Sequence, residues 1–474
     1  MLRPAGDGVG IWRASDARGA KWIADAEEGV GSCQPSQHNV HQGDNLERRF
    51  VFQSRGDRLL TMSIEHVETL VVGGGQAGLA LSHMLSQRGC QHLVLERGRI
   101  AERWRTERWD GLRFQFPNWS VQLPDFPFPH ADPDAFATSA EIVDFLNAYA
   151  DFIAAPIRCG VTVTALRRRE GASGFVAETS NGAIEAANVV VATGPYQRPI
   201  IPALLPEDAS LFQVHASRYR EPDQLPPGAV LIVGSGASGA QIAEELVRAG
   251  RHVYLSVGHH RRLPRRYRGR DLIWWLSALG LDQTPVENRG PDKSLPLITG
   301  AYGGHTIDFR HFATQGMTLL GRVEAAREGT LDLASDLADS LAFGDAAYAA
   351  FLDRADAHVA RHGLDMPEEP GARSVPPDPP CLVEPLRRLE LHAAGIGAVI
   401  WATGYGCDFS WIDVPVLDAS GEPVHRGGVT NEPGLYFLGL QWLSKMNSSF
   451  LAGVGDDAAR LADHIAGQKG GRGR

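Results

Sequence analysis

Two glycine loops hold the residues with the clearest chemical use in this sequence. The first follows the apolar run 69–72 and contains Gly73, Gly75, Gln76, Ala77 and Gly78. In a G-x-G-x-x-G loop, Gly73 turns the chain, Gly75 lets the backbone approach a pyrophosphate, and Gly78 lets a helix pack on a strand. Phosphates favour the N-terminus of that helix, where backbone N–H groups lack partners. A Gly-rich turn without a ligand is the alternative.

A carboxylate follows at the offset that such a site requires. A second apolar run, 92–95, ends in Glu96, and Arg97 comes next. About 20 residues separate the loop from this acid, the distance expected of an acid that binds a ribose hydroxyl. Because strand, loop, helix, strand and acid all fall in register, the pattern favours a dinucleotide site over a plain turn.

The second loop repeats the pattern after the apolar run 230–233. Its residues are Gly234, Ser235, Gly236, Ser238 and Gly239. The next strand, 252–257, ends without an acid and offers Ser256, Arg261 and Arg262. A 2′-phosphate prefers guanidinium, whereas an acid would repel it, so the second loop favours NADP over NAD. The alternative is that these arginines form a solvated or interdomain face, which we favour for Arg265, Arg266 and Arg268.

Small residues follow two buried strands. The run 189–191 leads into Ala192 and Gly194, and the run 398–401 leads into the same Ala-Thr-Gly turn at 402–404. Such turns permit close approach of a ligand or a second domain. The last strand, 434–440, contains Gly439, and Ser449 and Phe450 precede a helix predicted from about 453 to 466. The N-terminus of that helix can face the electron-rich end of an isoalloxazine ring.

The passage 104–128 is rich in proline and aromatic residues and begins with Trp104. It is too rigid and apolar for a solvated linker, so it is expected to pack on something flat. A flavin-covering loop and a buried connection between domains explain it equally well. Beyond it, a helix is predicted over 138–152, because Thr138 or Ser139 can cap it and apolar residues recur at helical spacing. Alternating strands are expected at 161–164, which includes Val163, and at 175–177.

Composition limits the functions open to the chain. Its 474 residues predict two or three domains, and its hydrophobic content of 43% is ordinary for a globular protein. A net charge of −10 argues against nucleic acid as the main partner. No uninterrupted apolar stretch reaches the roughly 20 residues needed to span a bilayer. The five cysteines are scattered and form no CxxC pair, so neither a disulfide framework nor a zinc site is indicated and a cytoplasmic location is expected.

Two stretches narrow the class of protein. The passage from Trp104 to Pro124 resembles a segment of the plant YUCCA-type enzymes, and Gln115 takes the place of a His in their Leu-x-Leu-His-Leu-Pro core. The stretch 212–220 is similar to a FxGxxxHxxxY(K/R) signature, with its Gly missing and a shortened spacing before His215. From about 65 to 466 the chain therefore resembles the class B flavin-dependent monooxygenases, in the flavin-containing monooxygenase and YUCCA-type branch.

The resemblance implies an α/β fold of two Rossmann-like domains, the second inserted in the first. FAD would occupy the first and NADPH the second. We expect an FAD-binding domain over 62–203 with a return segment over 405–467, and an NADPH-binding domain over 204–404 with a helical insertion at about 265–380. Residues 1–61 are interpreted as a disordered leader or a mis-assigned start, and 468–474 as a disordered tail. Within the insertion, the apolar face at 272–279 is expected to be core or a wall of the substrate cavity.

The implied chemistry is oxygenation of a small organic substrate by molecular oxygen, through a C4a-hydroperoxyflavin that NADPH reduction of FAD makes possible. Gln115 is the candidate for a hydrogen bond to that adduct or to nicotinamide, and His215 for a hinge between the domains more than a general base. The full set of expected cofactor contacts is Gly73, Gly75, Gln76, Ala77, Gly78, Glu96, Arg97, Trp104, Gln115, Val163, Ala192, Gly194, Gly234, Ser235, Gly236, Ser238, Gly239, Ser256, Arg261, Arg262, Gly439, Ser449 and Phe450.

Other functions stay open on the sequence. An FAD-containing NADPH oxidoreductase could pass electrons to a quinone or a protein partner without inserting oxygen. A non-catalytic flavin-binding regulator is a third class. The substrate could be indole-3-pyruvate, an amine, a sulfide or a ketone, since a fold does not choose among them. No metal site is expected, and the sequence is compatible with a homodimer.

Overall fold

A computed structural model describes residues 49–51, 61–206, 211–290 and 295–472. The chain forms two units, 1–64 and 65–474. In the first, strands β1 (Arg49–Val51) and β2 (Thr61–Ser63) pair antiparallel. The leader predicted over 1–61 otherwise lies outside the described residues and stays a prediction. The site and its supporting elements belong to the second unit.

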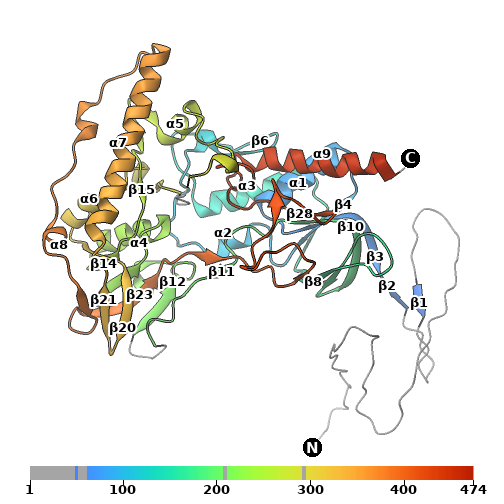
Figure 1. Ribbon diagram of the computed structural model, residues 1–474, viewed down its shortest axis with the longest axis horizontal. Helices are drawn as coiled ribbons and strands as arrows, with labels where there is room; N and C mark the ends of the chain where they lie inside the picture. The colour runs from blue at the N-terminus through green and yellow to red at the C-terminus, as the bar shows by residue number, and fades with distance from the viewer. Residues whose placement is uncertain (1–48, 52–60, 207–210, 291–294, 473–474) are drawn as a thin grey trace, which may run out of the picture. The chain divides into compact units, whose positions relative to one another are not determined.

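A parallel sheet forms the centre of the first lobe of this unit (Figure 1). Its strands in spatial order are β7 (Ile157–Cys159), β4 (His92–Glu96), β3 (Glu65–Val72), β10 (Gly182–Val191) and β28 (Leu435–Phe437). β3 is buried over its last four residues and β4 over all but its final Glu96, because helices cover the sheet. Helix α1 (Gln76–Gln87) packs along the C-terminal helix α9 (Val454–Arg472). β8 (Val163–Arg168) and β9 (Phe175–Thr179) add an antiparallel meander to the first half of β10.

The second lobe repeats this plan. Its all-parallel sheet has the order β12 (Phe212–His215), β23 (Ile396–Trp401), β13 (Ala229–Val233), β14 (Val253–Ser256) and β19 (Thr318–Leu320). Helix α4 (Ala237–Arg248) follows the second glycine loop, and β20 (Val323–Arg327), β21 (Thr330–Leu333) and β22 (Arg388–Glu390) form a separate antiparallel sheet. Two Rossmann-like sheets, the second inserted in the first, confirm the predicted fold class.

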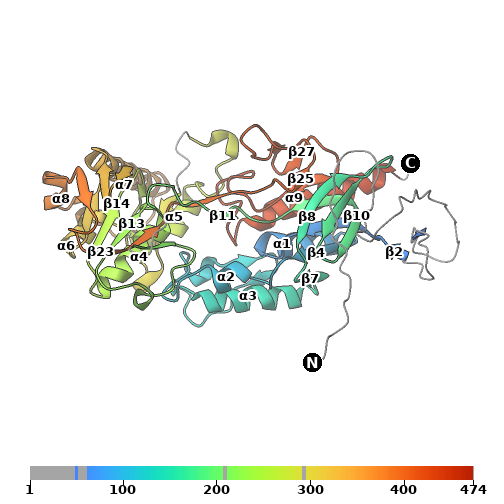
Figure 2. The ribbon, with the colours of Figure 1, turned by 90° about the horizontal axis from the view of Figure 1, so that it is seen from below.

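The chain crosses between the lobes twice, and the two crossings pair with each other. β11 (Arg198–Pro199) and β24 (Tyr405–Gly406) form an antiparallel ribbon. In Figure 2 the ribbon element β11 lies between the two lobes. The crossings fall near the expected domain boundaries at 203/204 and 404/405, whose exact positions stay predictions.

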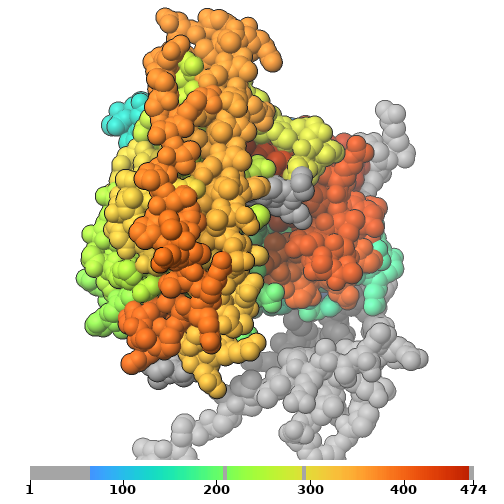
Figure 3. Space-filling view, turned by 60° about the vertical axis from the view of Figure 1, so that its left-hand side comes forward, coloured from blue at the N-terminus to red at the C-terminus, as the bar shows by residue number. Residues whose placement is uncertain are grey.

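The region 265–380 differs from the expected helical insertion. It contains α5 (Leu272–Ala278), α6 (Phe309–Thr314) and α7 (Leu337–His362), but β19 lies among them and belongs to the second sheet. β19 has only three residues. So short a run shows no periodicity, so the sequence did not predict this strand. The long helix α7 forms much of the face of the second lobe seen in Figure 3. No helix in the described part of the chain is long and apolar enough to cross a membrane.

The described ranges contain further helices and strands. They are α2 (Glu102–Thr106), β5 (Gln122–Leu123), β6 (Phe126–Pro127), α3 (Ser139–Phe152), β15 (Arg261–Arg262), β16 (Arg266–Tyr267), β17 (Arg270–Asp271), β18 (Pro296–Leu297), α8 (Pro380–Val383), β25 (Ile412–Asp413), β26 (His425–Arg426) and β27 (Val429–Thr430).

Helix ends show where local sequence chemistry suffices. Thr138 and Glu141 form the capping box of α3 and fix its start, as the sequence predicts. At the other end of the chain, α9 continues to Arg472, whereas an unstructured tail was expected from 468. The amide of Gln468 bonds the His464 ring one turn earlier, which extends the helix past the last apolar residue of its buried face.

A half-buried acid in α4 couples the second lobe to the aromatic passage 104–128. Glu245 accepts a hydrogen bond from the Tyr219 hydroxyl at 3.2 Å. Gly111 lies against it so closely that a Cβ there would sit 2.2 Å from the carboxylate. Burial raises the pKa of Glu245 to about 7, and the nearby Asp110 and Glu221 add to the rise.

The raised pKa predicts a pH-dependent stability. The folded chain holds the Glu245 proton more tightly than the unfolded chain, whose glutamates have a pKa of about 4.5. This component of the free energy of unfolding should therefore fall as pH rises from about 4.5 to about 7. Urea unfolding at pH 5 and pH 7.5 should show the fall in the wild type and a smaller one in Glu245→Gln. An unchanged pH dependence in Glu245→Gln would contradict the assignment.

Candidate functional site

The first glycine loop has one glycine for each of three geometric demands. Gly73 has a φ of +114°, and a Cβ there would lie 2.5 Å from the Ala192 carbonyl oxygen. A Cβ at Gly78 would lie 1.9 Å from the Gly73 carbonyl oxygen. At Gly75, by contrast, no atom lies within 4 Å of that position. Gly73 and Gly78 are therefore required by packing, and Gly75 keeps a space open for a ligand.

The second loop has the same geometry. Gly234 has a φ of +106° and faces the Ala402 carbonyl oxygen at 2.5 Å from an ideal Cβ. Gly239 packs against Gly234 at 1.9 Å by the same measure, and Gly236 again faces open space. Each loop thus lies against an Ala-Thr-Gly turn of its own lobe and leaves its middle glycine clear. This cradle fits a pyrophosphate at both helix N-termini.

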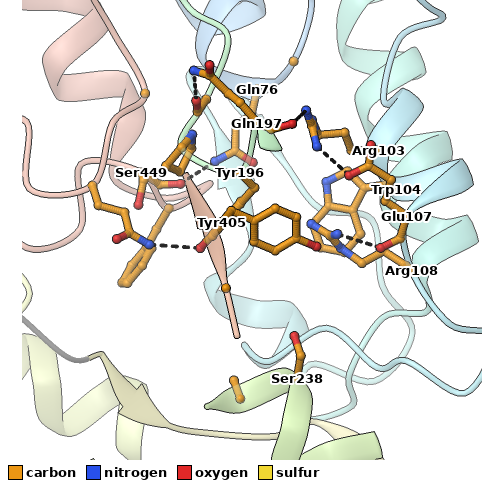
Figure 4. Close-up of a pocket in the computed structure, with 18 of the residues that line it drawn as sticks. Gln76, Arg103, Trp104, Glu107, Arg108, Tyr196, Gln197, Ser238, Tyr405 and Ser449 are labelled. Atoms are coloured by element: carbon orange, nitrogen blue, oxygen red, sulfur yellow. Dashed lines mark hydrogen bonds and ion pairs between the residues drawn. The ribbon is translucent and has the colours of Figure 1, made fainter. Parts of the chain in front are cut away.

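One cavity of about 1000 Å³ joins the open sides of the two loops. Figure 4 shows Ser238 across it from Gln76 and Ser449. Eighteen residues expected from the sequence line it, namely Gly73, Gly75, Gln76, Ala77, Glu96, Arg97, Trp104, Gln115, Val163, Ala192, Gly194, His215, Ser235, Gly236, Ser238, Gly439, Ser449 and Phe450. Gly78, Gly234 and Gly239 lie behind its wall as packing residues. Ser256, Arg261 and Arg262 do not line it either.

Glu96 is held at the end of β4 beside the first loop. Its two carboxylate oxygens accept hydrogen bonds of 2.8 Å from the backbone N–H groups of Gly74 and Gly98. A carboxylate accepts about four hydrogen bonds, so each oxygen can accept another, and Glu96 lines the cavity. The arrangement fits a ribose hydroxyl at this acid.

The C-terminal segment closes on the first loop. The Gln76 side chain donates a hydrogen bond of 2.6 Å to the Ser449 carbonyl. Gly439 approaches Ala77 so closely that a Cβ there would lie 2.6 Å from the Ala77 Cβ. Residues far apart in sequence thereby form one wall beside the N-terminus of α1.

Arg262 has a different role from the one that the sequence suggests. Its guanidinium is buried, forms ion pairs with Asp308 and Asp345, and stacks on Tyr348 at 4.3 Å. Ser256 is also buried and donates to the Gly321 carbonyl at 3.1 Å. These partners replace the expected 2′-phosphate. An arginine-rich run predicts a negative partner, but the sequence alone does not distinguish a phosphate from a carboxylate.

His215, the last residue of β12, is a neutral connector to the second crossing. Its Nε2 lies 3.1 Å from the Gly404 carbonyl, which can only accept, so Nε2 carries the proton. Its Nδ1 then accepts from the Ser217 N–H at 3.1 Å. Burial lowers the pKa of His215 and keeps the ring neutral. Because both nitrogens have partners, the geometry suits a hinge and leaves no free lone pair for a general base.

The aromatic passage 104–128 divides into two parts. Trp104, Phe114, Phe116 and Phe450 form a chain of ring contacts at 5.6, 5.3 and 5.1 Å along the cavity. Farther on, Phe126 and Phe128 pack on Phe145 of α3 instead. The first part lines the cavity, so its interpretation as a flavin cover stays a prediction, and the second packs within the core of the first lobe instead of connecting two domains.

The sequence did not single out Arg265 or Gln241 as site residues. Arg265 is 2% exposed, pairs with Asp271, and donates to the Gln115 carbonyl at 2.7 Å and the Thr299 carbonyl at 3.3 Å. It thus fixes the backbone of Gln115, the expected catalytic residue, from the second lobe. Gln241 lies three residues after Ser238 on the same face of α4, and this helical spacing was the signal available.

Comparison with known proteins places this architecture in a class. Residues 70–278 match the pyridine nucleotide-disulphide oxidoreductase family. The solved structure of a flavin-containing monooxygenase from Stenotrophomonas maltophilia aligns over 85% of this chain and 99% of its own, with a TM-score of 0.58 and 17% identity. A complex of OTEMO with FAD and NADP covers 85% of each chain at a TM-score of 0.50 and 17% identity. These likenesses show the fold of two-dinucleotide flavoproteins.

Relatives in sequence narrow the class. An uncharacterised CzcO-like oxidoreductase of Geobacillus kaustophilus is 34% identical over 84% of this chain and 98% of its own length. A probable indole-3-pyruvate monooxygenase, YUCCA1 of Arabidopsis thaliana, is 31% identical over 50% of this chain and 58% of its own length. The chain therefore belongs to the CzcO-like oxidoreductases, and over half of its length it is similar to a flavin-dependent monooxygenase.

The two kinds of glycine in the first loop predict two different defects. Gly75→Ala should fold with nearly wild-type stability and lose FAD affinity at least tenfold, because its Cβ enters the space kept for phosphate. Gly78→Ala should be destabilised by about 1–3 kcal/mol, as overpacked sites are. Urea unfolding and FAD titration of the apoprotein measure the two effects. Equal loss of stability in both variants would contradict the assignment.

Arg265 predicts a positioning effect at Gln115. Arg265→Met should release the Gln115 carbonyl, change the visible spectrum of bound flavin and increase the fraction of NADPH consumed as hydrogen peroxide. Arg265→Lys should bring the flavin spectrum and the hydrogen peroxide fraction part of the way back to the wild-type values, because lysine keeps one donor and the charge opposite Asp271. Arg266→Ala, which removes contacts to the carbonyls of 303 and 304, is the matched control. A flavin spectrum and coupling ratio that match the wild type in Arg265→Met would refute the role.

Proposed function

We propose that this chain binds FAD at the first glycine loop and NADPH at the second, and inserts one oxygen atom of molecular oxygen into a small organic substrate. The observation that carries the proposal is the single cavity onto which both loops open their middle glycines. A protein with one cofactor needs one such loop. Two loops on one cavity support direct hydride transfer between two dinucleotides.

Each cofactor has its own residues. Gly75 and the N-terminus of α1 would hold the FAD pyrophosphate, Glu96 the adenosine ribose, and Gln76 with Ser449 the wall beside the ring system. Gly236, Ser235 and Ser238 would hold the NADPH pyrophosphate. The chemistry that bound FAD would supply is the acceptance of two electrons from NADPH and the activation of molecular oxygen.

The remaining residues exclude water from the cavity or form hydrogen bonds. Trp104, Phe114 and Phe116 line the cavity with apolar rings and keep bulk water from it. The Gln115 side chain lies between Phe114 and Phe116 in the chain and lines the same cavity, so its amide Nε2 can donate to a charge that develops on the cofactor. His215, with both nitrogens engaged, holds the crossing in place.

The proposed reaction balances without a further reductant. NADPH, a proton, oxygen and substrate give NADP⁺, water and the oxygenated substrate. The competing reaction would pass the same two electrons to a quinone or a protein partner. A thiol-disulfide version of it finds no support, because none of the described residues that line the cavity is a cysteine.

Isotopic oxygen tests the function. The holoprotein with NADPH and ¹⁸O₂ should give a product that contains one ¹⁸O atom per molecule, with one NADPH consumed for each product. Thioethers, amines, ketones and indole-3-pyruvate are the classes to screen. Substrate-independent electron transfer to a quinone, with no ¹⁸O in any product, would favour the reductase instead.

Gln115 predicts a defect in coupling. Gln115→Leu should keep FAD bound and NADPH oxidation rapid, while the hydrogen peroxide formed per NADPH rises several-fold, because the stabilising amide donor is lost. Gln122→Leu, at an exposed position outside the cavity lining, should leave the ratio unchanged. Peroxide and NADPH assays measure it, and an unchanged ratio in Gln115→Leu would refute the role of this amide.

A further inference from the structure

The charges that line the cavity are unevenly distributed. Every acid and every arginine among its described lining residues lies in the first lobe or a crossing, namely Glu96, Arg97, Glu102, Arg103, Glu107, Arg108, Arg113, Arg198 and Asp408. Figure 4 shows Arg103, Glu107 and Arg108 gathered beside Trp104. Several of them pair among themselves, as Arg103 does with Glu107. This charged side also holds Glu96, Arg97 and Trp104, three of the residues expected around FAD.

The part of the lining around α5 and the C-terminal segment carries no acid, arginine or lysine among the described lining residues. We call it the uncharged wall, and it consists of Phe116, Leu272, Leu276, Ile298, Met446 and Phe450. These six side chains belong to one apolar cluster that joins α5 to the C-terminal segment. The nearby ion pair of Arg265 and Asp271 is internally neutralised and is already committed to backbone carbonyls.

One polar group adjoins the uncharged wall. Gln241 is 4% exposed, lines the cavity, and donates through Nε2 to the Ile298 carbonyl at 3.4 Å. Because a carbonyl can only accept, the amide nitrogen must face Ile298. Its Oε1 is thereby left buried without a hydrogen-bond partner in the structure. A buried acceptor of this kind favours a ligand that donates.

We propose that the uncharged wall and Gln241 select an uncharged, mainly apolar substrate with one N–H or O–H donor; the proposal rests on the oxygenase function proposed above. The donor meets Gln241 Oε1, and the apolar part lies on Leu272, Leu276 and Phe450. A substrate carboxylate placed there would lose its water without gaining a cationic partner, and it would face the lone pairs of Oε1. The site therefore discriminates against α-keto acids and other anions.

Three thioethers with the same reacting sulfur separate the effect of the substrate's hydrogen-bond donor from the effect of its charge. They are 4-(methylthio)benzamide, which donates N–H, methyl p-tolyl sulfide, which has no donor, and 4-(methylthio)benzoate, which is an anion. Isothermal titration into oxidised holoprotein saturated with NADP⁺ measures their affinities without turnover. The amide should bind at least threefold more tightly than the tolyl compound and at least tenfold more tightly than the benzoate.

Two variants assign the preference to its residues. Gln241→Leu should remove the advantage of the amide and leave the affinity for methyl p-tolyl sulfide within twofold. Leu276→Arg should place a cation on the wall and raise benzoate affinity relative to the tolyl compound, whereas Ser277→Arg, on the exposed side of the same helix, should not. Gln241→Leu serves as the test by itself if Leu276→Arg does not fold.

The outcomes separate this proposal from the function on which it rests. Preferential binding of benzoate, or no binding of either uncharged compound, would overturn the proposal. An unchanged amide preference in Gln241→Leu would overturn the role of Gln241. Binding in the expected order without ¹⁸O incorporation would leave the selective wall in place and reject the oxygenase. Incorporation of ¹⁸O into anionic substrates alone would keep the oxygenase and reject the wall.

Discussion

The contact between a glycine and the carbonyl at the end of a neighbouring strand determines the rest of this structure. Gly73 meets Ala192 in the first lobe, and Gly234 meets Ala402 in the second, with 2.5 Å between an ideal Cβ and the carbonyl oxygen in each case. No side chain fits there, so each loop turns directly above its sheet. This placement brings the helix N-terminus and the open face of the middle glycine to the carboxyl edge of the parallel strands, where ligands of such sheets bind.

The second requirement is that the two edges face one cavity, and a small number of polar contacts maintain this. β11 pairs with β24 at the crossings, and His215 bonds the Gly404 carbonyl as a neutral ring. Arg265 reaches from the second lobe to the backbone of Gln115. A buried ion pair such as Arg265 with Asp271 adds little net stability, so its value here is positional. The result is one cavity whose charged lining residues come from the first lobe and the crossings, and whose lining around α5 is apolar.

Local sequence predicted the elements that local chemistry determines. Both glycine loops, the acid at Glu96, the capping box at Thr138 and eighteen residues of the cavity lining follow from short motifs and strand ends. It failed where the partner lies far away in sequence. Arg262 resembled a phosphate ligand because nothing near it shows Asp308 and Asp345, which lie 46 and 83 positions along the chain. The three-residue strand β19 and the reach of Arg265 to Gln115 likewise depend on tertiary packing, which a single sequence does not display.

The central claim is that both loops hold dinucleotides that exchange a hydride within one cavity. Anaerobic titration of the purified chain tests it most directly. Denaturation should release one FAD per chain, and one equivalent of NADPH should bleach the flavin absorbance completely in the intact protein. A chain that contains no FAD and cannot be reconstituted with it, or one whose flavin NADPH leaves oxidised, would contradict the account.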